Sequence, residues 1–159
     1  MKRTSAREWW GYLLILTSIL GIDQLVKALV YRDLRPIGSF ELWPGVFRLT
    51  YCENTGAAFS ILSGQTWFFI VLTLVLCTLL TVLLFKGKVR SALGRVCLVC
   101  VIGGGVGNLI DRVFRGFVVD MFDFYLIDFA VFNVADVFVC CGSILFILLF
   151  LFSKGEILD

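Results

Sequence analysis

Four long apolar blocks constrain the fold of this chain more than any other feature of its sequence. A transmembrane helix needs about 20 predominantly apolar residues to cross a hydrocarbon core roughly 30 Å thick. Hydrophobic residue types make up 60% of the 159 residues, and they are concentrated in these blocks. We therefore predict one integral membrane domain over residues 1–159, an all-α fold whose four transmembrane helices occupy about residues 9–31, 67–85, 96–112 and 134–152.

The distribution of Lys and Arg predicts how these helices are oriented, because basic residues are enriched in short cytoplasmic loops. They are dense at both termini and in the short loop after the second block, and sparse in two long loops, about residues 32–66 and 113–133. We expect both termini on the cytoplasmic side and both long loops outside. The dense clusters consist of Lys2, Arg3, Arg7, Lys86, Lys88, Arg90, Arg95 and Lys154.

The two long loops carry different structural signals. In the first, two short β-prone runs flank Pro44-Gly45, which predicts a small extracytoplasmic β-element. The second mixes aromatic residues with Asp120, Asp123 and Asp128. This mixture predicts a loop or helix at the level of the lipid headgroups, with its rings toward the membrane and its carboxylates toward water.

Composition excludes several classes of function. The chain has no histidine, which removes histidine-activated nucleophiles and the commonest zinc ligand. Its net charge is only +2, without a basic stripe for nucleic acid. Five of the six cysteines lie inside apolar blocks, so we interpret them as ordinary helix positions. We therefore expect no metal, no cofactor and no nucleic-acid partner.

Ionisable residues inside membrane spans are costly and are candidates for function. Asp23 and Lys27 lie one helical turn apart in the first block. They form either a structural i,i+4 ion pair or the support of an active site at the outer face. In the third block, Asp111 and Arg115 have the spacing of an ion pair, which leaves Asn108 and Arg112 for a substrate. Glycines four residues apart in the same block let membrane helices pack closely.

Two further segments place polar residues near the outer ends of the blocks. The segment Asn54-Thr55-Gly56-Ala57-Ala58-Phe59 is either a turn that re-enters the membrane or a binding loop. Asn133 and Asp136 have the spacing of a helix N-cap and a first-turn acid. Asp120, taken alone, is a solvated loop carboxylate. Together with Asp136, it offers two carboxylates at one water–lipid boundary.

Two carboxylates a few ångströms apart cannot both ionise cheaply, so they share a proton. The ionised one takes a proton from water, while the protonated one polarises a peptide carbonyl. This is the chemistry of an aspartic protease, and it requires no metal, cofactor or covalent nucleophile.

The ordered motifs of the chain resemble those of the lipoprotein signal peptidase family (signal peptidase II, aspartic peptidase family A8). The resemblance implies that Asp120 and Asp136 are the catalytic pair, and that Asn54, Asn108, Arg112 and Asn133 bind the substrate or orient the pair. Asp23, Lys27 and Gly56 fall in the same motifs as supporting residues. Met121 and the short stretch 126–131 depart from the usual pattern of the family. The motifs are Asp23-Gln24-x-x-Lys27, Asn54-x-Gly56-Ala57-Ala58-Phe59, Gly104-Gly105-x-Gly107-Asn108-x-x-Asp111-Arg112, Val118-Val119-Asp120 and Phe132-Asn133-x-Ala135-Asp136.

The resemblance implies an endopeptidase that cleaves prolipoprotein signal peptides just before a diacylglyceryl-modified cysteine. We expect a monomer in the bacterial cytoplasmic (inner) membrane, in contact with membrane lipids and with its active site at the extracytoplasmic face. One alternative is a proton conductor, but the carboxylates gather toward one face and leave the inner half uncharged. Another is a serine–lysine peptidase that uses Lys27 with Ser60 or Ser63, but Lys27 has a ready partner in Asp23. A non-catalytic assembly factor would not need two matched aspartates.

Overall fold

The computed structural model describes residues 5–152 of the chain, so Lys2, Arg3 and Lys154 of the predicted cytoplasmic clusters lie outside the described residues. Four of its helices are long and apolar enough to cross a membrane. They accompany a three-stranded antiparallel sheet, which confirms the predicted fold class. The elements are α1 (Ala6–Leu29), the π-helical turn η1 (Val30–Leu34), β1 (Ser39–Trp43), β2 (Phe47–Asn54), the 3₁₀ turn η2 (Ala58–Ser60), α2 (Thr66–Phe85), α3 (Ala92–Arg115), β3 (Val118–Asp123), the 3₁₀ turn η3 (Tyr125–Ile127) and α4 (Val134–Phe152).

The ends of the helices follow local capping signals. Ser5 and Glu8 form a capping box at the start of α1. Ser91 caps α3 by accepting a hydrogen bond from the backbone N–H of Gly94, so this helix begins at Ala92 instead of the expected residue 96. Gly116 closes α3 in the left-handed conformation, with φ of 82°, which glycine adopts without steric cost.

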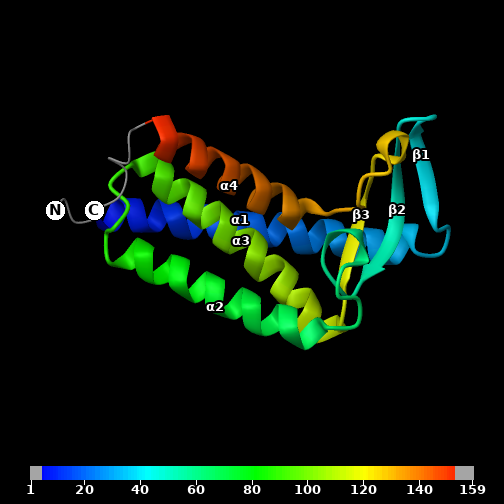
Figure 1. Cartoon of the computed structure of the whole chain (residues 1–159), viewed down its shortest axis with the longest axis horizontal. Coiled ribbons are helices and arrows are strands. Elements are labelled where there is room, and N and C mark those ends of the chain that lie inside the picture. Colours follow the sequence, from blue (N-terminus) through cyan, green and yellow to red (C-terminus); the bar gives the residue numbers. More distant parts are fainter. Residues whose placement is uncertain (1–4, 153–159) are drawn as a thin grey trace.

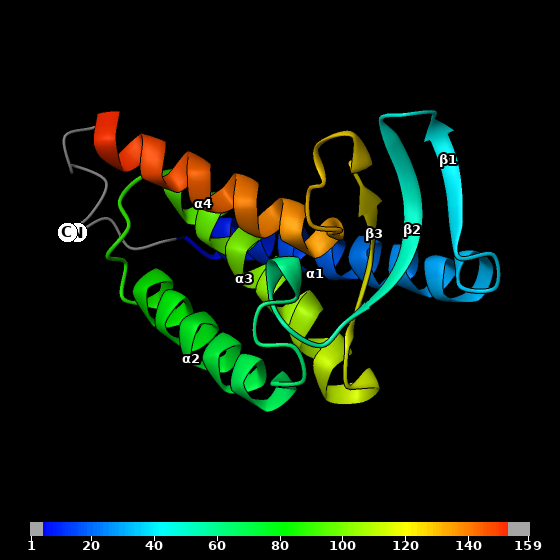
Figure 2. The same cartoon turned by 45° about the vertical axis from the view of Figure 1, so that its right-hand side comes forward.

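Helix α3 lies at the centre of the bundle and packs against the other three helices (Figures 1 and 2). A Cβ atom at Gly103 would lie 3.0 Å from Ile19 of α1, and one at Gly105 would lie 2.9 Å from Cys77 of α2. At Gly104, it would lie 2.3 Å from the backbone oxygen of Ala135 on α4. Three consecutive glycines thus allow close approach to three different helices, in agreement with the close helix packing expected of the glycines in this block.

The sheet lies at the end of the bundle away from the start of α1 and the end of α4 (Figure 1). Its order is β1-β2-β3. The antiparallel pair β1–β2 is the hairpin predicted around Pro44-Gly45. Strand β3 pairs with β2 and places Cys52 opposite Asp120. The sheet therefore places Asp120 at that same end of the bundle.

Strand β3 corrects the prediction for the second long loop. Asp120 and Asp123 do not face water, because they are only 1% and 5% exposed. Val119 and Met121 pack in a core cluster with Val30 at the end of α1. The strand forms because β2 supplies its hydrogen-bonding edge, and that partner lies more than 60 residues earlier in the chain. Asp128 is exposed, as expected.

Candidate active site

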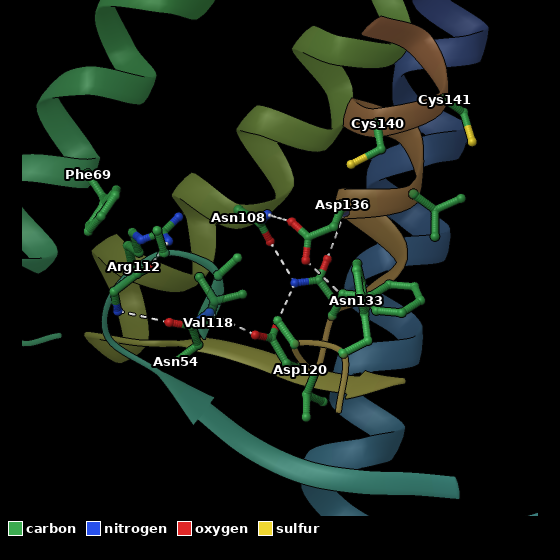
Figure 3. Close-up of a pocket in the computed structure, with 18 residues that line it drawn as sticks. Asn54, Phe69, Asn108, Arg112, Val118, Asp120, Asn133, Asp136, Cys140 and Cys141 are labelled. Atoms are coloured by element: carbon green, nitrogen blue, oxygen red, sulfur yellow. Dashed lines mark hydrogen bonds between the residues drawn. The ribbon is translucent and has the colours of Figure 1, made fainter. Parts of the chain in front are cut away.

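Asp120 and Asp136 line one cavity of about 540 Å³ between the bundle and the sheet. We call it the dyad cavity. Asp120 comes from β3, and Asp136 comes from the first turn of α4. Figure 3 shows the two carboxylates on either side of Asn133. Four more polar residues from the predicted set line the same cavity, namely Asn54, Asn108, Arg112 and Asn133.

Asp136 is held by the local structure that starts α4. Its backbone N–H donates to Asn133 Oδ1 at 3.0 Å, and the backbone N–H of Asn133 donates to Asp136 Oδ2 at 3.1 Å. This reciprocal pair has the geometry of a capping box. Asn108 Nδ2 donates to the other carboxylate oxygen at 2.7 Å. The predicted capping role of Asn133 is therefore correct, and it also orients the carboxylate of Asp136.

Asp120 is held by two side-chain amides. Asn133 Nδ2 donates to Oδ1 at 2.6 Å, and Asn54 Nδ2 donates to Oδ2 at 2.9 Å. Burial, together with the nearby charge of Asp136, raises the pKa of Asp120 from 3.8 to about 7, against the opposing effect of the two amide donors. Asp120 therefore takes up a proton far more readily than an exposed aspartate.

The side-chain amides of Asn54, Asn108 and Asn133 are each oriented by a donor that binds the amide oxygen. Lys27 Nζ donates to Asn108 Oδ1 at 2.8 Å. Gly56 N–H donates to Asn54 Oδ1 at 2.8 Å, and Asp136 N–H donates to Asn133 Oδ1. Because an ammonium group or a backbone N–H cannot accept a hydrogen bond, each amide must turn its NH₂ group away from that donor. All three NH₂ groups consequently point at the two carboxylates.

Behind these amides lies a buried ionic cluster. Lys27, Asp23 and Asp111 are fully buried, and Lys27 Nζ lies 2.9 Å from Asp23 Oδ2 and 3.4 Å from Asp111 Oδ2. Arg115 forms an ion pair with Asp111 as well. Both predicted i,i+4 ion pairs are thus present. A Cβ atom at Gly107 would lie 2.6 Å from Asp23 Oδ2, so only glycine leaves room for this carboxylate.

The two carboxylates of the cluster also hold the backbone beside the cavity. Asp23 Oδ1 accepts a hydrogen bond from the N–H of Ala135 at 2.9 Å. Asp111 Oδ2 accepts one from the N–H of Val119 at 3.1 Å. Ala135 and Val119 directly precede Asp136 and Asp120. The cluster therefore holds both aspartates through the backbone of the residue before each of them. The sequence spacing did not reveal this role for Asp111.

Arg112 connects α3 to the loop after β2. Its Nη2 donates to the backbone oxygen of Gly56 at 2.9 Å, and its guanidinium carbon lies 5.1 Å from the centre of the Phe69 ring. Among the described buried side-chain atoms, Arg112 Nε has no hydrogen-bond partner, so it is a free donor in the wall of the cavity. A Cβ atom at Gly56 would lie 2.5 Å from the backbone oxygen of Ile61. The segment that begins at Asn54 is both a tight turn and part of the cavity wall.

The dyad cavity also has an apolar portion that sequence reasoning missed. It is lined by Phe69 of α2 and by Val137, Cys140 and Cys141 of α4. Nothing in the sequence distinguishes these residues from others in the same apolar blocks. Their position in the cavity follows from the way α2 and α4 lie on either side of α3 (Figure 2).

Comparison with known proteins gives a consistent result. The sequence model described as "Signal peptidase (SPase) II" matches residues 15–152. The chain is 42% identical over 145 residues to the lipoprotein signal peptidase of Clostridioides difficile, covering 91% of this chain and 97% of that protein. It is 44% identical over 144 residues to the lipoprotein signal peptidase of Streptococcus pneumoniae, covering 90% and 92% respectively.

The fold is also similar to solved structures. A bacterial membrane enzyme determined by the in meso method at 2.3 Å resolution matches with a TM-score of 0.84 and 33% identity, covering 92% of this chain and 90% of that chain. A second, at 1.9 Å resolution, matches with a TM-score of 0.79 and 34% identity, covering 89% and 92%. The arrangement of four helices and a small sheet is therefore shared with experimentally determined membrane enzymes.

Proposed function

Because the chain belongs to the signal peptidase II family, we propose that Asp120 and Asp136 are the catalytic pair with which it cleaves prolipoproteins. The activity of the family is that of a lipoprotein signal peptidase, an aspartic peptidase that processes prolipoproteins. The observation that carries the assignment is the convergence of four donors, one backbone N–H and three side-chain amides, on the carboxylates of Asp120 and Asp136 in one cavity. Donors in such numbers hold two carboxylates at a fixed separation and orientation.

The pair acts with one proton between its two carboxyl groups. The ionised carboxylate removes a proton from water, and the resulting hydroxide attacks the carbonyl carbon of the scissile peptide bond. The protonated carboxyl donates its proton to the carbonyl oxygen as the tetrahedral intermediate forms. The C–N bond then breaks as the amide nitrogen takes a proton from one carboxyl group and a hydroxyl of the tetrahedral intermediate returns its proton to the other, which restores the singly protonated pair. The products are a free carboxylate on the signal peptide and an amine on the cysteine.

Arg112, Asn108 and Asn54 are proposed to position the substrate backbone and the pair. Arg112 Nε is a donor at the cavity wall and suits a peptide carbonyl. Lys27 contacts Asp23, Asn108 and Asp111, so it supports Asn108 instead of acting as a base for a serine. Asp23 supports the pair by accepting a hydrogen bond from the N–H of Ala135, and the backbone oxygen of Gly56 binds the guanidinium group of Arg112.

We further propose that the enzyme is a monomer. Both of its termini lie in the cytoplasm, and the pair lies at the outer face of the membrane. The described basic residues Arg7, Lys86, Lys88, Arg90 and Arg95 support this orientation. The apolar portion of the dyad cavity suits a substrate held by a transmembrane signal peptide and by acyl chains on its cysteine. Contact with membrane lipids follows from the exposed apolar faces of the helices.

Cleavage of a purified precursor tests this proposal. The parent enzyme should cleave a diacylglyceryl-modified precursor just before its cysteine, and should hardly cleave the unmodified precursor. Asp120→Asn and Asp136→Asn keep the shape of each side chain but remove the shared proton, so each should lower kcat/KM by about three orders of magnitude or more. Mass spectrometry of the product locates the cleaved bond.

Asp33→Asn is a matched control, because Asp33 is exposed and forms its ion pair with Arg32. It should retain the activity of the parent. The assignment of the catalytic pair would be wrong if Asp120→Asn or Asp136→Asn stayed active. Equal rates on modified and unmodified precursors would remove lipid recognition from the proposal while leaving the pair intact.

A further inference from the structure

Asp120 also lines a second cavity, of about 250 Å³. We call it the outer cavity. Asn54 and Asp120 line both cavities, as do Ala57 and the segment 129–131. Asp136, Asn108 and Arg112 line the dyad cavity alone. The two cavities are therefore neighbours, and Asp120 lies in the wall of both.

The outer cavity differs chemically from the dyad cavity. Its own lining residues include Cys52, Thr55, Ser63 and Asp128, which the dyad cavity lacks. Thr55 and Ser63 pair through their hydroxyl groups at 3.0 Å, and Cys52 stands opposite Asp120 in the β2–β3 register. The dyad cavity instead extends along α4 to Cys140 and Cys141. One cavity thus offers polar side chains, and the other offers an apolar wall.

The outer cavity is also negatively charged. Besides Asp120, it is lined by Asp128 and Glu53, and its described lining residues include no Lys or Arg. Glu53 is partly neutralised, since its Oε1 lies 3.9 Å from Arg35 Nε and accepts a hydrogen bond from the Tyr51 hydroxyl. Asp128 is exposed at the cavity and forms no ion pair within the described residues. It is therefore the carboxylate most available to a ligand.

When a substrate binds with its scissile bond at the proposed catalytic pair, the peptide before that bond and the peptide after it lie in different surroundings. The half before the scissile bond is a membrane-spanning signal peptide, which fits the apolar dyad cavity. The half after the modified cysteine leaves the membrane for water, and the polar cavity next to Asp120 lies on its path. We propose that the outer cavity binds the residues that follow the modified cysteine, and that Asp128 makes this subsite prefer a cationic side chain. This inference rests on the proposed function.

Three lipid-modified precursors that differ only in the residue after the cysteine test this subsite, one each with Lys, Ser and Asp. The parent should cleave the Lys precursor with a kcat/KM about 1.5- to fivefold higher than the Asp precursor, the range expected for solvent-exposed charge pairs. Asp128→Asn should bring this ratio close to one. The matched control Asp33→Asn removes an exposed carboxylate that lies outside the cavity and should leave the ratio as in the parent.

The thiol of Cys52 provides an independent measurement inside the same cavity. A thiosulfonate reagent transfers a charged thiol group to Cys52 as a mixed disulfide and releases a sulfinate. A cationic group attached in this way should lower the ratio of kcat/KM for the Lys precursor to that for the Asp precursor, and an anionic group of similar size should raise it. The Cys52→Ser variant, treated with the same reagents, corrects for modification of Cys140 in the dyad cavity. Reduction of the mixed disulfide should restore the original ratio.

The outcomes separate this inference from the proposed function. If the parent cleaves none of the three precursors, the proposed function fails together with the subsite. If it cleaves all three at equal rates, the catalytic proposal stands and the subsite is refuted. A preference for Lys that persists unchanged in Asp128→Asn and after charge is attached to Cys52 also refutes the subsite.

Discussion

At the scale of single residues, the donors around Asp120 and Asp136 stabilise the fold and also hold the proposed catalytic pair. Asn133 begins α4 and also donates to Asp120. Asp23 neutralises Lys27 and also binds the N–H of Ala135. Removing one partner of a buried ion pair typically costs about 3–5 kcal/mol, because the other charge is left uncompensated. Substitutions in this cluster will therefore lower both stability and activity, so they cannot isolate catalysis.

The pH dependence of activity is a prediction about Asp120. A pair that shares one proton loses activity when both groups are protonated and when both are ionised, and its apparent pKa values belong to the pair. Since burial and Asp136 raise the pKa of Asp120 to about 7, we expect kcat/KM to fall as the pH rises above about 7. Measurement of kcat/KM from acidic to alkaline pH with the modified precursor checks this. A flat profile across that range would contradict a shared proton.

The raised pKa of Asp120 also makes the free energy of unfolding depend on pH, and the Asp120→Asn variant removes this contribution. The folded state keeps a proton on Asp120 at pH values where an unfolded aspartate has already lost it. Because the folded state binds more protons, the free energy of unfolding decreases as the pH rises from about 4 to about 7. The parent should therefore melt at a lower temperature at pH 7 than at pH 5, and Asp120→Asn should show a smaller difference.

At the scale of elements, α3 determines how closely the residues of the proposed catalytic site approach one another. Its glycines allow Ile19, Cys77 and Ala135 on three different helices to pack against its backbone. The same helix carries Asn108 and Asp111, which bind Asp136 and the N–H of Val119. The distance between α3 and α4 therefore sets the position of Asn108 relative to Asp136.

Gly104→Ala tests this dependence. Its Cβ would lie 2.3 Å from the backbone oxygen of Ala135 and 2.7 Å from Val139, so α3 and α4 must move apart. We expect a loss of about 1–3 kcal/mol in the free energy of unfolding and a clear loss of cleavage, because Asp136 follows Ala135. Thermal unfolding and the precursor assay measure both effects.

The control for this substitution is Gly21→Ala in α1, where a Cβ would meet nothing within 4 Å. It should be at least as stable as the parent, since alanine favours a helix more than glycine does. If Gly104→Ala matched Gly21→Ala in stability and activity, close packing of α3 against α4 would not be required.

At the scale of the whole molecule, the sheet lies at one end of the bundle, and the start of α1 and the end of α4 lie at the other (Figure 1). Cys52 lies in β2 at the sheet end, whereas the other five cysteines lie in α2, α3 and α4. A small membrane-impermeant thiol reagent added outside intact cells should therefore label Cys52. Burial and the nearby carboxylates raise the pKa of this thiol, so labelling should be faster at alkaline pH.

The Cys52→Ser variant is the control for this labelling and should lose the externally accessible signal. Labelling of Cys52 only after the membrane is opened would place the sheet in the cytoplasm. The predicted orientation would then be inverted, and the active site would lie at the inner face.

The sequence by itself determined the four helices, the hairpin and the two local ion pairs. Long apolar blocks, a Pro-Gly turn and the i,i+4 spacing of Asp23 with Lys27 all act over short stretches of chain, so they can be read in order. The residues alone suggested that Asp120 and Asp136 could act as a pair, although each carboxylate taken alone had an ordinary structural explanation. The family resemblance of the motifs then assigned the catalytic role to this pair.

Only the tertiary structure decided which residues meet across the chain. Strand β3 forms against a partner more than 60 residues away, and this pairing buries Asp120 and Asp123 instead of leaving them in water. The link from Lys27 through Asn108 to Asp136 joins three helices. Such contacts depend on packing between distant segments, and the free energy of a buried charge or amide depends on every neighbour that surrounds it. No local pattern encodes those neighbours, so the hydrogen-bond partners of the pair and the outer cavity became visible only in the folded molecule.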